Sequence, residues 1–283
     1  MLLERLIFDG SETDYVMRVL ESFVMSRAGD IGGGDATLVS EHYAAVIDGV
    51  TGKTRLLFDS LRSDQFAARE VATAISNLPP GIDGLQAVAR ISSALRDSVE
   101  SLGFDSNLVS SPGATLGVVS LARDELWVIG DISALVDGVL LPGAPPPTDA
   151  VLCGLRAAYL SSLLLAGASV EDLLIDDPSQ RLIGPMLEQQ WLFSNTVGSP
   201  WSYGVIDGRD AASLHLKVVD ISGAAEVVLF SDGFFKAETT LAGTLAAHRA
   251  LVAADPLCIN EHQEFNACGG GGWDDMAYLR LTR

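Results

Sequence analysis

Four aspartates stand at the ends of short apolar runs, and they are the main chemical signal in this sequence. They occur in the segments AAVIDGVTG, LWVIGDIS, VVLFSDGFF and GGWDDMAYLRL, as Asp48, Asp131, Asp232 and Asp274. A buried strand delivers its terminal side chain to a fixed place on the rim of a sheet, so neighbouring strands can bring several carboxylates to one point. Carboxylates gathered in this way repel one another unless a cation neutralises them.

The ligands that this set offers are all oxygen atoms, which favours Mg²⁺ or Mn²⁺ over zinc. Asp48 and Asp232 are each followed by glycine, whose backbone can turn sharply and expose a carbonyl as a further ligand. An Asp-Gly pair after a strand is most often a plain turn. These residues by themselves therefore leave a metal centre and a set of turns as two open interpretations.

The segments around the aspartates predict an α+β protein, because runs of strands have long helices grouped between them and the order is not a regular βαβ alternation. Apolar and β-branched runs bounded by turn residues indicate strands at Ala44–Ile47, Thr115–Leu121, Leu126–Ile129, Leu214–Val219, Val227–Phe230 and Met276–Leu281. Helical periodicity indicates helices at Ser63–Asn77, Asp83–Leu102, Asp149–Gly167, Arg181–Phe193 and Leu241–Ala253, with an added one around Tyr15–Phe23.

Composition places the chain among soluble globular proteins. Of 283 residues, 48% are hydrophobic, and 18 basic against 37 acidic side chains give a net charge of −19. That balance argues against nucleic acid and anionic membranes as partners, because no basic stripe is present. A bound divalent cation can still invert the field locally and admit an anionic substrate.

Cysteine usage and the apolar segments bear on location. Cys153, Cys258 and Cys268 are far apart and form no CxxC pair, which predicts a reducing compartment. The first residues lack the pattern of a secretory signal. The most apolar segment, Ala157–Ala168, is too short to span a bilayer. We therefore expect a cytoplasmic protein.

Four segments in order resemble the motif series of the metal-dependent protein phosphatase (PPM) family, the type-2C serine/threonine phosphatases. They are GGGDATLVSEHYAAVIDGVTG, ATLGVVSLARDELWVIGDIS, AEVVLFSDGFF and WDDMAYLRL. The resemblance covers about residues 26–283 and implies a single domain over residues 1–283, with residues 1–25 as an N-terminal extension. It also implies an αββα four-layer sandwich, in which two antiparallel sheets are flanked by helices.

The resemblance implies two Mg²⁺ or Mn²⁺ ions. Asp48 would bridge them, Gly49 would lend its carbonyl, and Asp232 and Asp274 would complete the shell of one ion. The expected reaction is hydrolysis of a phosphomonoester, on phosphoserine or phosphothreonine, by a metal-activated water without a protein nucleophile. The expected partner is a phosphoprotein or a small phosphomonoester.

Further positions follow from the same resemblance. Asp35 matches an acidic residue near the second ion, and Asp131 matches the aspartate associated with a third, weaker ion. The phosphate-clamping arginine of the family has no counterpart just upstream of Asp35, and Arg27 or Lys53 would replace it by position.

The sequence departs from the family pattern at three places. Gly34 stands where an acidic residue is usual, Val50 where many members carry a histidine, and Lys236 where an aspartate is common. These departures motivate two alternatives to a protein phosphatase. One is a catalytically weakened pseudophosphatase that acts as a binding or regulatory module, and the other is a small-molecule phosphatase.

Overall fold

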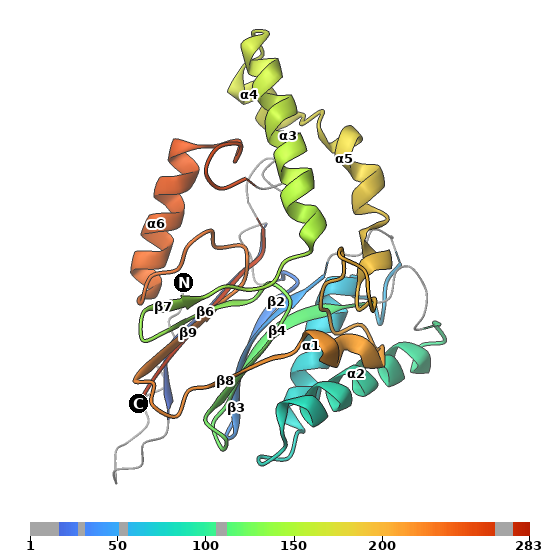
Figure 1. Cartoon of the computed structure of the whole chain (residues 1–283), viewed down its shortest axis with the longest axis vertical. Helices are drawn as coiled ribbons and strands as arrows, with labels where there is room; N and C mark the ends of the chain where they lie inside the picture. The colour runs from blue at the N-terminus through green and yellow to red at the C-terminus, as the bar shows by residue number, and fades with distance from the viewer. Residues whose placement is uncertain (1–16, 28–31, 51–55, 106–111, 264–273) are drawn as a thin grey trace.

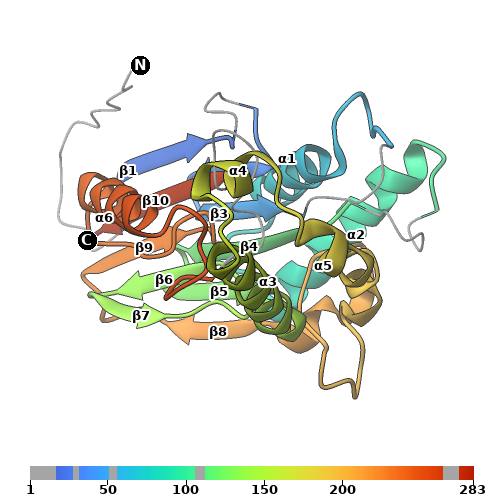
Figure 2. The same ribbon diagram turned by 90° about the horizontal axis from the view of Figure 1, so that it is seen from above.

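Two antiparallel sheets stack face to face and carry helices on their outer faces (Figures 1 and 2). The computed structural model describes residues 17–27, 32–50, 56–105, 112–263 and 274–283. Within them the layers run from helices α1 and α2 through the two sheets to helix α6. The expected αββα sandwich of two antiparallel sheets flanked by helices is therefore confirmed.

In the part of the chain that the structure describes, each sheet contains five strands. The first sheet has the order β1–β10–β9–β6–β7, with bounds Arg18–Met25, Met276–Thr282, Glu226–Phe230, Ser133–Val136 and Val139–Leu141. The second has the order β2–β3–β4–β5–β8, with bounds Asp35–Val39, Tyr43–Gly49, Ala114–Ser120, Glu125–Ile129 and Lys217–Asp220. Both sheets thus combine strands from distant parts of the chain.

The two-residue period of strand β3 explains how one strand serves two cores. Tyr43, Ala45 and Ile47 point toward α1 and α2, whereas Ala44 and Val46 point into the layer between the sheets. Successive side chains of a strand face opposite sides, so a strand buried on both faces reads as a continuous apolar run. The same alternation places the even-numbered Asp48 on the intersheet side, where β3 ends at the rim.

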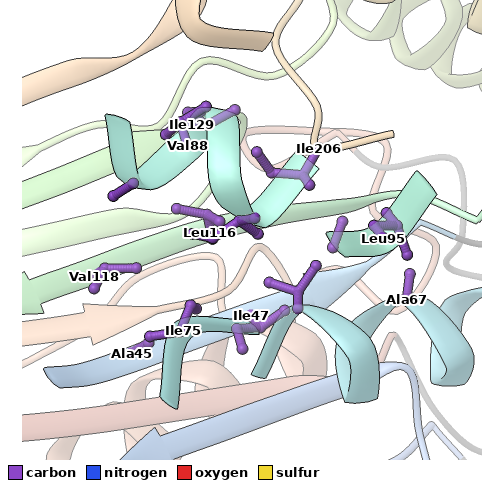
Figure 3. Packing of buried hydrophobic residues seen from close by; sticks show 14 of the residues in the cluster. Ala45, Ile47, Ala67, Ile75, Val88, Leu95, Leu116, Val118, Ile129 and Ile206 are labelled. Carbon is purple, nitrogen blue, oxygen red and sulfur yellow. The ribbon is translucent and has the colours of Figure 1, made fainter. Parts of the chain in front are cut away.

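Helices α1 (Ser63–Ser76) and α2 (Gly84–Ser101) cover the second sheet. Their apolar stripes, including Ile75 and Leu95, meet Leu116 of β4 in a continuous core (Figure 3). Asp83 caps α2 by accepting a hydrogen bond from the backbone N–H of Gln86.

Helix α6 (Leu241–Ala254) covers the first sheet, where Leu241 and Leu245 pack against Phe234 and Tyr278. Between β7 and β8, helices α3 (Pro147–Leu165), α4 (Val170–Ile175) and α5 (Gln180–Leu187) form an arm that rises from the sheets (Figure 1). Two 3₁₀ helices follow: η1 (Gln190–Phe193) and η2 (Asp210–His215).

Three local expectations are wrong. The segment expected to be helical at Tyr15–Phe23 contains strand β1, whose alternating exposure follows from antiparallel pairing with β10. The strand expected at Leu214–Val219 begins only at Lys217, because η2 continues to His215. The single helix expected at Arg181–Phe193 is divided into α5 and η1.

Most of the apolar segment expected at Ala157–Ala168 is part of a longer helix, α3. It spans 19 residues, so by length and composition it is long enough to cross a membrane, although a core helix passes the same test. Its fully buried Arg156 forms an ion pair with Asp177, so this side of α3 packs against the rest of the arm.

Candidate metal centre

Three aspartates meet at the rim where strands of both sheets end. Asp48 lies near the end of β3, Asp131 follows β5, and Asp232 follows β9. Each offers a carboxylate oxygen, and the three oxygens lie within 4.8 Å of one another. Packing of the two sheets therefore creates one oxygen-lined point from segments that are far apart in the sequence.

Strand register places two further side chains beside Asp48. Asp35 of β2 pairs with it on one side and Thr115 of β4 pairs with it on the other. The hydroxyl of Thr115 donates a hydrogen bond of 2.6 Å to Oδ1 of Asp131. Thr115 thereby orients one of the three clustered carboxylates.

Ser231 joins the two sheets at the same rim. Its hydroxyl donates to Oδ2 of Asp35 over 2.6 Å and accepts from the backbone N–H of Ala277 over 2.9 Å. The backbone N–H of Ser231 in turn donates to the carbonyl of Ala277 at 3.0 Å. The single donor of this buried hydroxyl is engaged by Asp35 and one of its two lone pairs by Ala277, so Ser231 holds the two sheets in position at this rim.

Burial is the main influence on the pKa values of these carboxyl groups, and neighbouring negative charges add to it for Asp48 and Asp35. Burial, followed by the charges of Asp35, Asp131 and Asp274, raises the pKa of Asp48 well above its ordinary value. Burial also raises the pKa of Asp35 well above the ordinary value, against the hydrogen bond from Ser231. The pKa of Asp131 is raised by burial too, although Thr115 opposes the shift.

Removal from water disfavours the charged form of all three carboxyl groups, and repulsion between neighbouring carboxylates adds to this for Asp48 and Asp35. A divalent cation removes the cost by supplying positive charge at the point where the oxygens converge. The donor set is made of oxygen atoms, which fits Mg²⁺ or Mn²⁺. The residues present therefore fit a hard divalent cation.

Gly49 is packed tightly against the start of α1. A Cβ atom at Gly49 would lie 2.1 Å from the carbonyl oxygen of Asp64, and one at Gly34 would lie 3.0 Å from Oδ2 of Asp64. The side chain of Asp64 is buried, and Arg62 donates to it through Nη2 at 2.7 Å and through Nε at 3.1 and 3.2 Å. Asp64 thus lies directly beside Gly34, where the usual acidic residue of the family pattern is missing.

The closing strand supplies two adjacent aspartates with different surroundings. Asp274 lies close enough for its charge to raise the pKa of Asp48. The carboxylate of Asp275 accepts hydrogen bonds from the backbone N–H groups of Arg27, at 2.6 Å, and of Gly34. Asp275 therefore fixes the backbone that leads into Asp35.

The two positions expected to bind phosphate remain predictions. The backbone of Arg27 is held near the centre by Asp275, whereas Lys53 lies outside the described residues. Lys236, which replaces a common aspartate, is largely exposed and forms an ion pair of 2.9 Å with Glu238.

The motifs do not single out four residues that shape this centre: Thr115, Ser231, Asp64 and Asp275. The sequence gives an indirect indication of two of them, because Ser231 and Asp275 are adjacent to the candidate ligands Asp232 and Asp274. Thr115 and Asp64 act only through their position beside β3, which depends on strand register and on how α1 packs.

No protein-family model and no curated protein matches the chain. Among solved structures it is similar to the serine/threonine phosphatase PstP of Mycobacterium tuberculosis, with 18% identity over 94% of this chain and 98% of that chain, at a TM-score of 0.46. It is also similar to a structure of the PstP catalytic domain with two manganese ions, with 17% identity over 94% of this chain and 98% of that chain, at a TM-score of 0.46. The serine/threonine phosphatase Stp1 of Staphylococcus aureus has 11% identity over 98% of this chain and 99% of that chain, at a TM-score of 0.46. These are structures of serine/threonine phosphatases, and the likeness is one of fold alone.

Proposed function

We propose that this protein is a Mg²⁺- or Mn²⁺-dependent phosphatase that hydrolyses phosphomonoesters, with phosphoserine or phosphothreonine in proteins as its substrates. The observation that carries the proposal is the convergence of Asp48, Asp131 and Asp232 within 4.8 Å. Asp35, Asp274 and the carbonyl of Gly49 are the further proposed ligands. Bound divalent cations would activate the attacking water and neutralise the charge of the phosphoryl group.

The residues of the chain have distinct parts in this proposal. Asp48 stands at the middle of the carboxylates and is the ligand proposed to be shared by two ions. Thr115 and Ser231 hold Asp131 and Asp35 in fixed orientations through hydrogen bonds of 2.6 Å. Fixed ligands require little rearrangement when the cations bind or when charge develops on the phosphate.

The direct test is phosphate release from p-nitrophenyl phosphate by the full chain with Mn²⁺. Asp48→Asn and Asp232→Asn are each expected to lower kcat by about 100-fold or more, because each removes a charged ligand from the centre. Asp97→Asn is the matched control, since Asp97 is an exposed residue of α2 outside the cluster. Its activity should equal that of the parent protein.

Calorimetric titration with Mn²⁺ separates the enzyme from the alternative of a binding module. The phosphatase is expected to bind two ions and to turn over substrate at saturating metal. Binding of one ion or none, together with absence of turnover under every divalent metal tested, would contradict the proposal and favour the module.

A further inference from the structure

A large groove opens from the candidate metal centre. It has a volume of about 880 Å³, and Asp131 and Asp232 lie in its lining. Its walls come from the β6–β7 hairpin with the turn that follows it, the start of α3, the loop after β9 and the loop after α6. The groove is far larger than a phosphate group needs, because sites of 300–1,000 Å³ hold whole drug-sized ligands.

The floor of the groove is apolar and closely packed. Phe230 and Phe234 line it and are buried. The ring of Phe234 meets the edge of Tyr278 with centroids 6.4 Å apart. The neighbouring ring of Phe235 also lines the groove and lies between two histidine rings, with centroids 5.4 Å from His248 and 5.6 Å from His262. A small charged ester would leave this apolar surface unused.

The walls of the groove are held by hydrogen bonds. Ser133 accepts from the backbone N–H of Gly143 at 2.9 Å, which fixes the turn after β7. The hydroxyl of Thr244 accepts from the N–H of Glu238 at 2.9 Å and donates to its carbonyl at 3.1 Å. Asp255 accepts from the N–H of Asn260 at 2.8 Å. Since the walls are preformed, an extended ligand would bind with little loss of entropy from the protein.

The charged side chains that line the groove beyond the aspartate cluster are mainly acidic. Among the described residues they are Asp149, Glu238 and Glu261 against the cation Lys236, so their sum is 1 − 3 = −2. Lys236 is already engaged by Glu238 at 2.9 Å. Acidic walls attract a cationic segment and repel an anionic one. The whole chain, with a net charge of −19, strengthens this preference at low salt.

We propose that this groove binds the polypeptide on either side of the phosphorylated residue and selects segments that carry lysine or arginine there. The inference rests on the proposed phosphatase function and specifies its substrate as a cationic phosphopeptide. The metal centre receives the phosphate, the acidic walls receive the neighbouring cations, and the aromatic floor receives apolar side chains.

Two phosphoserine peptides test the proposal, identical except that four flanking positions carry lysine in one and glutamate in the other. With Mn²⁺ and low ionic strength at pH 8, kcat/KM is expected to be about tenfold higher for the lysine peptide. Salt at 0.5 M should reduce the ratio to about twofold, because screening weakens exposed charge pairs.

Charge reversal locates the effect. In the double variant Glu238→Lys and Glu261→Lys, the lysine-to-glutamate ratio of kcat/KM should fall below about 2 at low salt, because the walls of the groove no longer attract the lysine peptide. The matched control is Glu41→Lys with Asp97→Lys, which changes the net charge equally at exposed sites outside the groove. This control should keep a ratio of about fivefold or more.

The outcomes distinguish this inference from the proposed function. Absence of Mn²⁺-dependent turnover of p-nitrophenyl phosphate would defeat the phosphatase itself. Normal turnover of that ester with equal kcat/KM for the two peptides would overturn only the groove proposal. A small ester preferred over both peptides, or a ratio unchanged by charge reversal in the groove, would overturn it as well.

Discussion

At the scale of single residues, the centre depends on groups that hold the aspartates as much as on the aspartates. Thr115 orients Asp131, and Ser231 links Asp35 to the opposite sheet. Gly49 allows the start of α1 to lie against the end of β3, because a side chain there would overlap the backbone of Asp64. The backbone of this site therefore tolerates little added volume.

Substitution of Gly49 by alanine tests this close approach. The added Cβ would lie 2.1 Å from a backbone oxygen, so α1 or β3 must shift. We expect Gly49→Ala to lower the free energy of unfolding by about 2 kcal/mol. Urea denaturation without added metal measures it. Gly81→Ala is the control, since its Cβ would meet no atom within 4 Å, and an equal loss in both variants would refute the explanation.

At the scale of elements, a buried ion pair holds the arm of α3, α4 and α5 together, and one further hydrogen bond joins the arm to the loop after α6. Nε of Arg156 donates to Oδ2 of Asp177 at 2.8 Å, and its Nη1 donates to the carbonyl of Leu257 at 2.7 Å. Burial would raise the pKa of Asp177, but hydrogen bonds from Ser179 and Arg156 outweigh it and lower that pKa. The ionised carboxylate therefore stabilises the folded arm.

Removal of this carboxylate has a pH-dependent cost. Asp177→Ala leaves Arg156 buried without its counter-charge and is expected to cost about 3–5 kcal/mol near neutral pH. A carboxyl group with a lowered folded-state pKa contributes fully above its unfolded pKa of about 3.9 and loses that contribution as pH falls through the folded value. The stability difference between parent and variant should therefore be constant from pH 7 to about 4.5 and shrink only below about 4.

Urea denaturation across this pH range, together with hydrogen exchange of the arm, measures the difference in unfolding free energy between Asp177→Ala and the parent protein. Asp176→Ala is the matched control, because its ion pair with Arg181 spans 3.4 Å between side chains that are 74% and 78% exposed. The control should change stability by less than about 0.5 kcal/mol. A gap between Asp177→Ala and the parent that narrows already at pH 6 would contradict the role given to Asp177.

At the scale of the whole molecule, packing of the two sheets is what forces the carboxylates together. Asp35 and Asp48 come from one sheet and Asp232 follows a strand of the other, and their mutual repulsion opposes the closed sandwich. Folding and cation binding are therefore coupled, since a cation that binds the folded state relieves this repulsion.

Mn²⁺ should accordingly stabilise the protein. At a concentration 100 times the Kd the expected gain is about 2.7 kcal/mol, or a rise in Tm of about 5–10 °C, reversed by a chelator. Without metal, Asp48→Asn should be at least as stable as the parent, because it removes one repelling charge. It should also lose most of the gain from Mn²⁺. Thermal unfolding measures both, and an equal rise in Tm from NaCl of matched ionic strength would show that general screening is sufficient.

The sequence by itself predicts much of the local structure and identifies the candidate ligands. Apolar periodicity predicted β3, β5, β9 and β10 and helices α1, α2, α3 and α6, because side-chain period depends only on neighbours along the chain. The aspartates at the ends of strands were visible for the same reason. The sequence does not predict strand β1, because its alternating exposure arises only when it pairs with β10.

Only the tertiary structure decided which of these residues meet. Ser231 reaches Asp35 across 196 positions, and Thr115 lies opposite Asp48 because β4 adopts one particular register. The periodicity of a strand specifies its two faces but not its neighbours, which depend on packing of the whole core. For the same reason the acidic groove beside the centre cannot be derived from composition. The surplus of acid is evident from the sequence, whereas the fold decides which few of these acidic residues line the groove.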